Sequence, residues 1–138
     1  MKVLLDTNII MDALQERAPF DFEAKKILKR AQASKELICL FTANAATDIF
    51  YLYSRARDAE SAKAALSFLI EKFGIVAVTQ DDSSAALALP IQDFEDALML
   101  ACAEKINADY IITRDDKFLQ VASSVKLIAP IDFLAIFL

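Results

Sequence analysis

Three aspartates stand at positions where a folded chain could use them for chemistry. Asp6 directly follows the apolar run VLL, Asp115 comes two residues after the end of the run YIIT, and Asp96 lies near the start of the helix-like segment FEDALMLACAEK. If both apolar runs are parallel strands of one sheet, Asp6 and Asp115 emerge at the same edge, where ligands of such sheets bind. A lone aspartate after a strand is typical of a turn or helix cap, but two at one edge favour a functional site.

Two further aspartates admit both a structural and a functional interpretation. Asp93 and Asp96 are three residues apart and share a helix face. In the structural interpretation, Asp93 is the N-cap and Asp96 is the N3 residue of a capping box. The two interpretations can coexist, with Asp93 capping the helix while Asp96 points into a site. Asp48 lies inside the helical pattern NAATDIFYLYSR beside its apolar stripe. A carboxylate there faces either solvent or something cationic, because burying it unpaired is costly.

Carboxylates gathered in one cleft need a neutralising partner. Two charges ~4 Å apart interact by ~4 kcal/mol at an effective dielectric of ~20, so like charges at that distance repel strongly. Hard divalent cations with oxygen ligands, chiefly Mg²⁺ or Mn²⁺, are the natural neutralising groups. Such an ion can activate water and stabilise the charge that develops on a phosphodiester. The aspartates therefore predict metal-assisted hydrolysis.

The composition excludes several other chemistries. The chain has no histidine, which excludes Ser-His-Asp triads, Cys-His dyads and His-ligated zinc. Its single glycine, Gly74, excludes a Walker loop and a GxGxxG loop. The net charge of −5 has the wrong sign for general nucleic-acid binding, unless bound cations offset the acidic site.

The sequence also indicates a location. No apolar stretch approaches the ~18 residues of a membrane span. The opening MKVLLDTNII reaches an aspartate after three apolar residues, which is too soon for a signal peptide. We therefore expect a cytoplasmic protein with no membrane partner.

Short apolar runs alternate with amphipathic helical patterns along the whole chain, as one domain over residues 1–138. The expected strands span 2–5, 37–41, 75–79, 109–113 and, more weakly patterned, 126–128. The expected helices span 8–16, 21–33, 43–57, 59–72, 82–89, 93–106 and 131–138, with Thr7 or Asn8 capping the first. This alternation predicts an α/β fold with a central parallel sheet of four to five strands and helices on both faces.

These motifs resemble those of the PIN domain family, named after the N-terminal domain of PilT, and especially its small stand-alone VapC-type toxins. The resemblance covers essentially the whole chain. LLDTNIIMDAL is similar to the first family motif, with Asp6 as the first metal carboxylate and Thr7 and Asn8 as its usual companions.

The segment DFEDALMLACAEKINADYIITRDDKF resembles the second half of the family pattern. Asp96 falls on the acidic residue before the alanine-rich helix. Asp115 falls on the acidic or amide position two residues after Thr113, which ends a strand. The resemblance thus implies that Asp6, Asp96 and Asp115 hold the metal.

The resemblance implies a three-layer α/β/α Rossmann-like fold and a Mg²⁺- or Mn²⁺-dependent endoribonuclease. It also implies an RNA substrate, a homodimer and, for the toxin class, a cognate antitoxin. Asp48 stands where the family usually has glutamate; its shorter side chain is expected to assist catalysis directly or through water. Asp93 and Asp116 are acidic neighbours that could substitute or assist. Arg114 and Lys117 flank Asp115 and are expected near the substrate phosphate.

Other interpretations fit the residues less well or stay open. A haloacid-dehalogenase-like phosphatase needs an aspartate where this chain has Asn8, and a response-regulator receiver needs an acidic pair where Asp6 stands alone. A catalytically silent PIN-like module that binds protein or RNA remains an alternative, because Asp48 departs from the pattern and the net charge is negative. Tyr51 and Tyr53 are expected to pack rather than to stack on bases.

Overall fold

A computed structural model describes residues 1–137. Leu138, expected as the last residue of the final helix, lies outside the described residues. The strands are β1 (Lys2–Leu5), β2 (Ile38–Thr42), β3 (Gly74–Val76), β4 (Tyr110–Ile112) and β5 (Lys126–Ile128). The helices are α1 (Thr7–Leu14), α2 (Asp21–Ala33), α3 (Ala43–Ala56), α4 (Ala59–Lys72), α5 (Gln80–Leu87), α6 (Phe94–Lys105), α7 (Asp116–Leu119) and α8 (Pro130–Phe137).

Within residues 1–137, five strands form one parallel sheet in the order β3-β2-β1-β4-β5. The chain runs outward from β1 through β2 to β3, and then returns to the other side of β1 to form β4 and β5. The direction of winding therefore reverses between β1 and β4, and the crevice at the carboxyl ends of these two strands is the expected ligand site. The predicted parallel sheet is confirmed.

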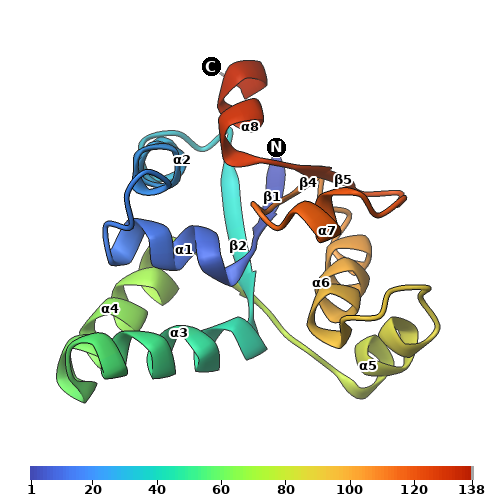
Figure 1. Ribbon diagram of the computed structural model, residues 1–138, viewed down its shortest axis with the longest axis horizontal. Helices are drawn as coiled ribbons and strands as arrows, with labels where there is room; N and C mark the ends of the chain where they lie inside the picture. The colour runs from blue at the N-terminus through green and yellow to red at the C-terminus, as the bar shows by residue number, and fades with distance from the viewer. Residues whose placement is uncertain (138) are drawn as a thin grey trace.

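Two helical layers cover the sheet, with α1 to α4 on one side and α5 and α6 on the other (Figure 1). Strand β1 connects the two cores because its side chains alternate between the faces. Val3 and Leu5 belong to the core beneath α1 to α4, while Leu4 belongs to the core beneath α6. No helix in the described part of the chain is long and apolar enough to cross a bilayer.

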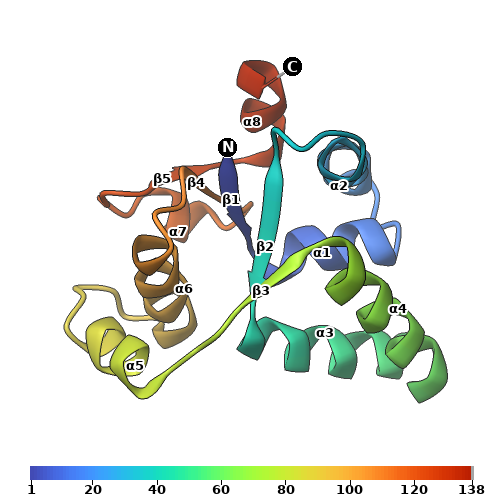
Figure 2. The same cartoon turned by 180° about the vertical axis from the view of Figure 1, so that it is seen from behind.

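The segment after β3 carries the chain across the sheet edge toward α5, in the opposite helical layer (Figure 2). There the predicted boundaries are wrong: the strand ends at Val76 and the helix begins at Gln80. A reciprocal capping box explains the early start, since the Asp82 N–H donates to Thr79 Oγ1 (3.3 Å) and the Thr79 N–H donates to Asp82 Oδ2 (2.9 Å). Lys105 Nζ at the end of α6 donates to Asp82 Oδ2 (2.6 Å) and so joins the first turn of α5 to α6.

Candidate active site

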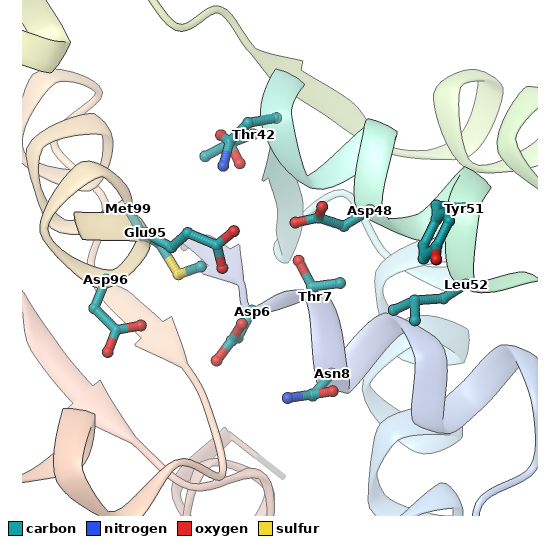
Figure 3. Close-up of a pocket in the computed structure, with 11 residues that line it drawn as sticks. Asp6, Thr7, Asn8, Thr42, Asp48, Tyr51, Leu52, Glu95, Asp96 and Met99 are labelled. Carbon is teal, nitrogen blue, oxygen red and sulfur yellow. The ribbon is translucent and has the colours of Figure 1, made fainter. Parts of the chain in front are cut away.

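An acidic pocket of about 300 Å³ opens at the carboxyl ends of β1 and β2. The carboxylates that line it come from three parts of the chain: Asp6 from the end of β1, Asp48 from α3, and Glu95 and Asp96 from the first turn of α6. Figure 3 shows these side chains arranged around one opening, together with Thr7 and Asn8. The structure thus brings together three of the acidic residues that the sequence indicated, namely Asp6, Asp48 and Asp96.

The Asp6 side chain is held by Thr113, the residue that follows the neighbouring strand β4. Its Oδ2 accepts a hydrogen bond from Thr113 Oγ1 (2.7 Å), and that same hydroxyl oxygen accepts the Asp115 N–H (3.1 Å). Thr113 is fully buried, so the bonds are shielded from water. The expectation that Thr7 or Asn8 caps the first helix is wrong: Asp6 occupies the N-cap position but makes no capping bond. Its carboxylate is held by Thr113 instead.

The surroundings of Asp6 disfavour an isolated negative charge. Burial is the main cause and raises the pKa of its carboxyl. Hydrogen bonds from the Thr113 side chain and the Thr7 backbone oppose the rise, while the negative charge of Asp115 adds to it. A bound cation would relieve this penalty as effectively as a proton.

The capping and pocket-lining roles are divided between Asp93 and Asp96, and no reciprocal capping bond from the Asp96 side chain occurs among the described residues. Asp93 is the N-cap of α6, and its Oδ1 accepts the Asp96 backbone N–H (3.1 Å). The Asp96 side chain lines the pocket with Asp6. Burial, followed by the negative charges of Asp93 and Asp6, raises the pKa of Asp96 to about 7. Without a cation, this carboxyl is therefore only partly ionised near neutral pH.

Glu95 also lines the pocket, although the sequence did not single it out. Burial is the first cause that raises the pKa of its carboxyl, followed by the charges of Asp48, Asp93 and Asp6. Consecutive residues on a helix point about 100° apart, yet both Glu95 and Asp96 line the pocket. In Figure 3 the longer Glu95 side chain extends toward the opening that Asp6 and Asp48 share. The sequence signal was the acidic pair Glu95–Asp96 itself.

Asp115 lies beside this pocket rather than in its lining. It is the N-cap of α7, and its Oδ1 accepts the N–H groups of Lys117 (2.9 Å) and Phe118 (3.4 Å). It lines an adjoining cavity of about 510 Å³ with Asp93, Asp96 and Lys117. Asp96 lines both cavities and is therefore the residue that the acidic pocket shares with the cavity of Asp115 and Lys117.

Arg114 is paired with a buried aspartate that does not line the acidic pocket. Its Nε and Nη2 donate to Asp12 Oδ2 (2.7 Å) and Oδ1 (3.2 Å), and its guanidinium lies 4.1 Å from the centre of the Phe20 ring. Asp12 is 1% exposed and was not identified from the sequence. Asp116 is exposed and lines a separate cavity with Arg114 and Phe20. These contacts attach the loop that carries Asp115 to α1.

The oxygen donors of the pocket fit a hard divalent cation. Besides the carboxylates, the side-chain Oδ1 of Asn44 is buried beside the pocket and has no hydrogen-bond partner among residues 1–137. Over the same residues, no three histidine, cysteine or acidic side chains form a group that could hold an ion. Mg²⁺ commonly binds through one or two protein carboxylates and keeps several waters, so the donor chemistry matches it.

Comparison with known proteins adds a family assignment to this geometry. The family model described as PIN domain matches residues 2–117 of the chain. By sequence, no curated protein is significantly similar to it.

Solved structures with the same fold include components of toxin–antitoxin systems. A toxin–antitoxin complex from Klebsiella pneumoniae matches with a TM-score of 0.69 at 24% identity, covering 93% of this chain and 97% of that one. VapBC-1 from nontypeable Haemophilus influenzae matches with a TM-score of 0.68 at 18% identity, covering 95% and 99%. The sarcin-ricin loop cleaving toxin VapC20 of Mycobacterium tuberculosis matches with a TM-score of 0.66 at 20% identity, covering 84% and 92%.

Proposed function

This chain belongs to the PIN domain family, and we propose that it is a divalent-metal-dependent endoribonuclease that acts as the toxin of a toxin–antitoxin pair. The fold neighbours support the toxin role, since one cleaves the sarcin-ricin loop and two belong to toxin–antitoxin assemblies. The proposal includes a cytoplasmic location, a homodimer and a cognate antitoxin protein as partners, and RNA as the substrate.

One observation carries the catalytic part of the proposal. Asp6 is a largely buried carboxylate at the switch point of the sheet, it is oriented by Thr113, and it shares its pocket with Asp48, Glu95 and Asp96. Burial and mutual repulsion raise the pKa of Asp6 and that of Asp96. Such a site gains stability from a cation, and a metal-activated water offers a route to hydrolysis in a chain without histidine.

The residues divide into distinct proposed roles. Asp6, Asp96 and Asp115 would hold Mg²⁺ or Mn²⁺, one or two of them directly and the rest through bound water, as is common for Mg²⁺. The ion would supply an activated water and neutralise charge on the phosphodiester. Asp48 and the Asn44 amide would add oxygen donors on the α3 side. Asp93 and Thr113 orient Asp96 and Asp6 through the hydrogen bonds described above.

The remaining residues of the proposed site surround this set. Thr7 and Asn8 line the same pocket, and Asp116 is the first residue of α7, directly after Asp115. Lys117 is the cation best placed for the substrate phosphate, because it lines the cavity that Asp96 and Asp115 share. Arg114 would act on the phosphate only if it left Asp12.

The test is cleavage of a mixed single-stranded RNA by the purified protein in Mg²⁺ or Mn²⁺. We expect Asp6→Asn to reduce the rate by about 10²–10³-fold, the scale on which one electrostatic stabiliser acts, and EDTA to abolish cleavage. Asp132→Asn, in the exposed first turn of α8, is the matched control and should cleave normally. Absence of both cleavage and calorimetric metal binding in folded protein would favour the catalytically silent module.

A further inference from the structure

Tyr51 forms an exposed aromatic wall of the acidic pocket. It lies on α3 three residues after Asp48, so the two side chains share a helix face. Figure 3 shows the ring beside Leu52 at the edge of the opening. Tyr51 lines the pocket and is nevertheless 56% exposed. The ring is therefore available to a ligand, and packing in the core does not account for it.

Arg55 holds this ring in place from the next helical turn. Its Nη1 donates to Tyr51 Oη (2.9 Å), and its guanidinium carbon lies 5.6 Å from the centre of the ring. A ring already restrained loses less rotational freedom when a ligand stacks on it. Arg55 also places a positive charge beside Tyr51, at the edge of a pocket whose charged lining residues are all acidic.

A second tyrosine–arginine pair, at the C-terminal end of the same helix, serves a different purpose. Arg57 Nη1 donates to Tyr53 Oη (3.3 Å), and its guanidinium carbon lies 6.0 Å from the ring centre. Tyr53 is 8% exposed and belongs to the main core. The two pairs have the same spacing, but only the Tyr51 pair leaves its ring open at the acidic pocket.

We propose that Tyr51, braced by Arg55, is a base-stacking platform for a nucleotide next to the scissile phosphate of single-stranded RNA. The proposal rests on the proposed function and names how that site recognises its substrate. Aromatic side chains that stack on unpaired bases are a common means of binding single-stranded nucleic acid.

The charge of the protein makes a stacking contact important. With a net charge of −5, the chain gains little from general attraction to the RNA backbone. A cation among the carboxylates would hold one phosphate, and Tyr51 lies on the wall of that same cavity of about 300 Å³. A base attached to the neighbouring sugar is therefore within reach of the ring, and Arg55 is placed to meet the adjoining phosphate.

The experiment measures binding without cleavage, in the unaltered protein with Ca²⁺, a hard cation that takes oxygen ligands, in place of Mg²⁺. The probes are single-stranded RNA hexamers that carry 2-aminopurine at one position at a time. Stacking on Tyr51 should quench the fluorescence at one position. Tyr51→Ala should abolish that quenching and weaken binding by about 10-fold, within the range of one base–aromatic stack. Tyr51→Phe should keep both, and Tyr53→Phe is the matched control that leaves both unchanged.

A hexamer with an abasic site at the quenched position separates base stacking from other effects. It should bind as weakly as the normal hexamer binds Tyr51→Ala, and Tyr51→Ala should weaken it no further. Equal weakening of both hexamers, no effect of Tyr51→Ala, or no binding at all would overturn the proposal; a protein partner for Tyr51 would then be the better interpretation. Cleavage of RNA with Mg²⁺ is assayed separately, so failure of the nuclease proposal is distinguishable from failure of this one.

Discussion

The two sides of the acidic pocket hold their polar groups in different ways. On the side built by β1, α1 and the loop after β4, the polar side chains bond to each other, Thr113 to Asp6 and Arg114 to Asp12. On the side built by α3 and α6, burial and negative neighbours raise the pKa of Glu95 and that of Asp96, and no side-chain hydrogen bond within residues 1–137 opposes the rise. The first side is preorganised by hydrogen bonds between its side chains, while the second side keeps negative charge that a cation can neutralise.

Asp12→Ala tests whether the stability of the side built by β1, α1 and the loop after β4 depends on the buried Asp12–Arg114 ion pair. Removing one partner of a buried pair costs about 3–5 kcal/mol, and we expect the lower end because the Arg114 side chain is 31% exposed. Urea unfolding measures the loss. Glu71→Ala, in the exposed Lys72–Glu71 pair, should change the free energy of unfolding by less than ~1 kcal/mol. Equal midpoints for Asp12→Ala and the unaltered protein would contradict this role.

Thr113→Val removes the hydroxyl group that joins the two strands while keeping the shape of the side chain. We expect the affinity for Mn²⁺ to fall by about 10–100-fold, the usual effect of losing a group that orients a metal ligand. Isothermal titration calorimetry measures it. Thr113→Ser retains the hydroxyl and should restore most of the affinity, while Thr47→Val on the exposed surface of α3 should have no effect. Full affinity in Thr113→Val would show that Asp6 needs no such support.

Asp96→Asn tests the side of the pocket built by α3 and α6, through the pH dependence of stability. In metal-free protein the unfolded chain releases this proton near pH ~4, whereas folded Asp96 keeps it until about pH 7. The unfolded state therefore binds fewer protons between these values, and stability falls as pH rises through that window.

Because an amide side chain cannot ionise, Asp96→Asn should match the unaltered protein at pH 4 and melt higher at pH 8. The expected difference is roughly 4 °C, for a gain of ~1 kcal/mol in a chain of this size. Thermal unfolding in EDTA measures it, and added Mg²⁺ should reduce the difference by neutralising the carboxylate. A variant that melts no higher than the unaltered protein at pH 8 would place Asp96 in well-solvated surroundings.

The sequence predicted what depends on local pattern and missed what depends on tertiary contacts. Apolar runs and helical periodicity located the strands and the long helices, and with them Asp6 and Asp96. The four-residue helix α7 was missed because one turn carries no periodicity, although Asp115 is its N-cap.

The sequence patterns could not predict contacts between residues that lie far apart in the chain. The Arg114–Asp12 pair joins residues 102 positions apart, and only the fold brings them together. The expectation that both tyrosines pack is right for Tyr53 and wrong for Tyr51, which is 56% exposed. The helix pattern could not show which residues of α3 border a pocket.

The hydrogen bond between Thr113 and Asp6 also has a consequence for biosynthesis. It joins residues 107 positions apart, and β1 must pair with β4 to form it. A growing polypeptide has β1 and Asp6 early but lacks their partners until translation has passed Thr113, at about 5–20 residues per second. The candidate active site is therefore completed only after β4 and Thr113 have been synthesised. A truncated or stalled nascent chain that ends before β4 would carry Asp6 without an assembled site.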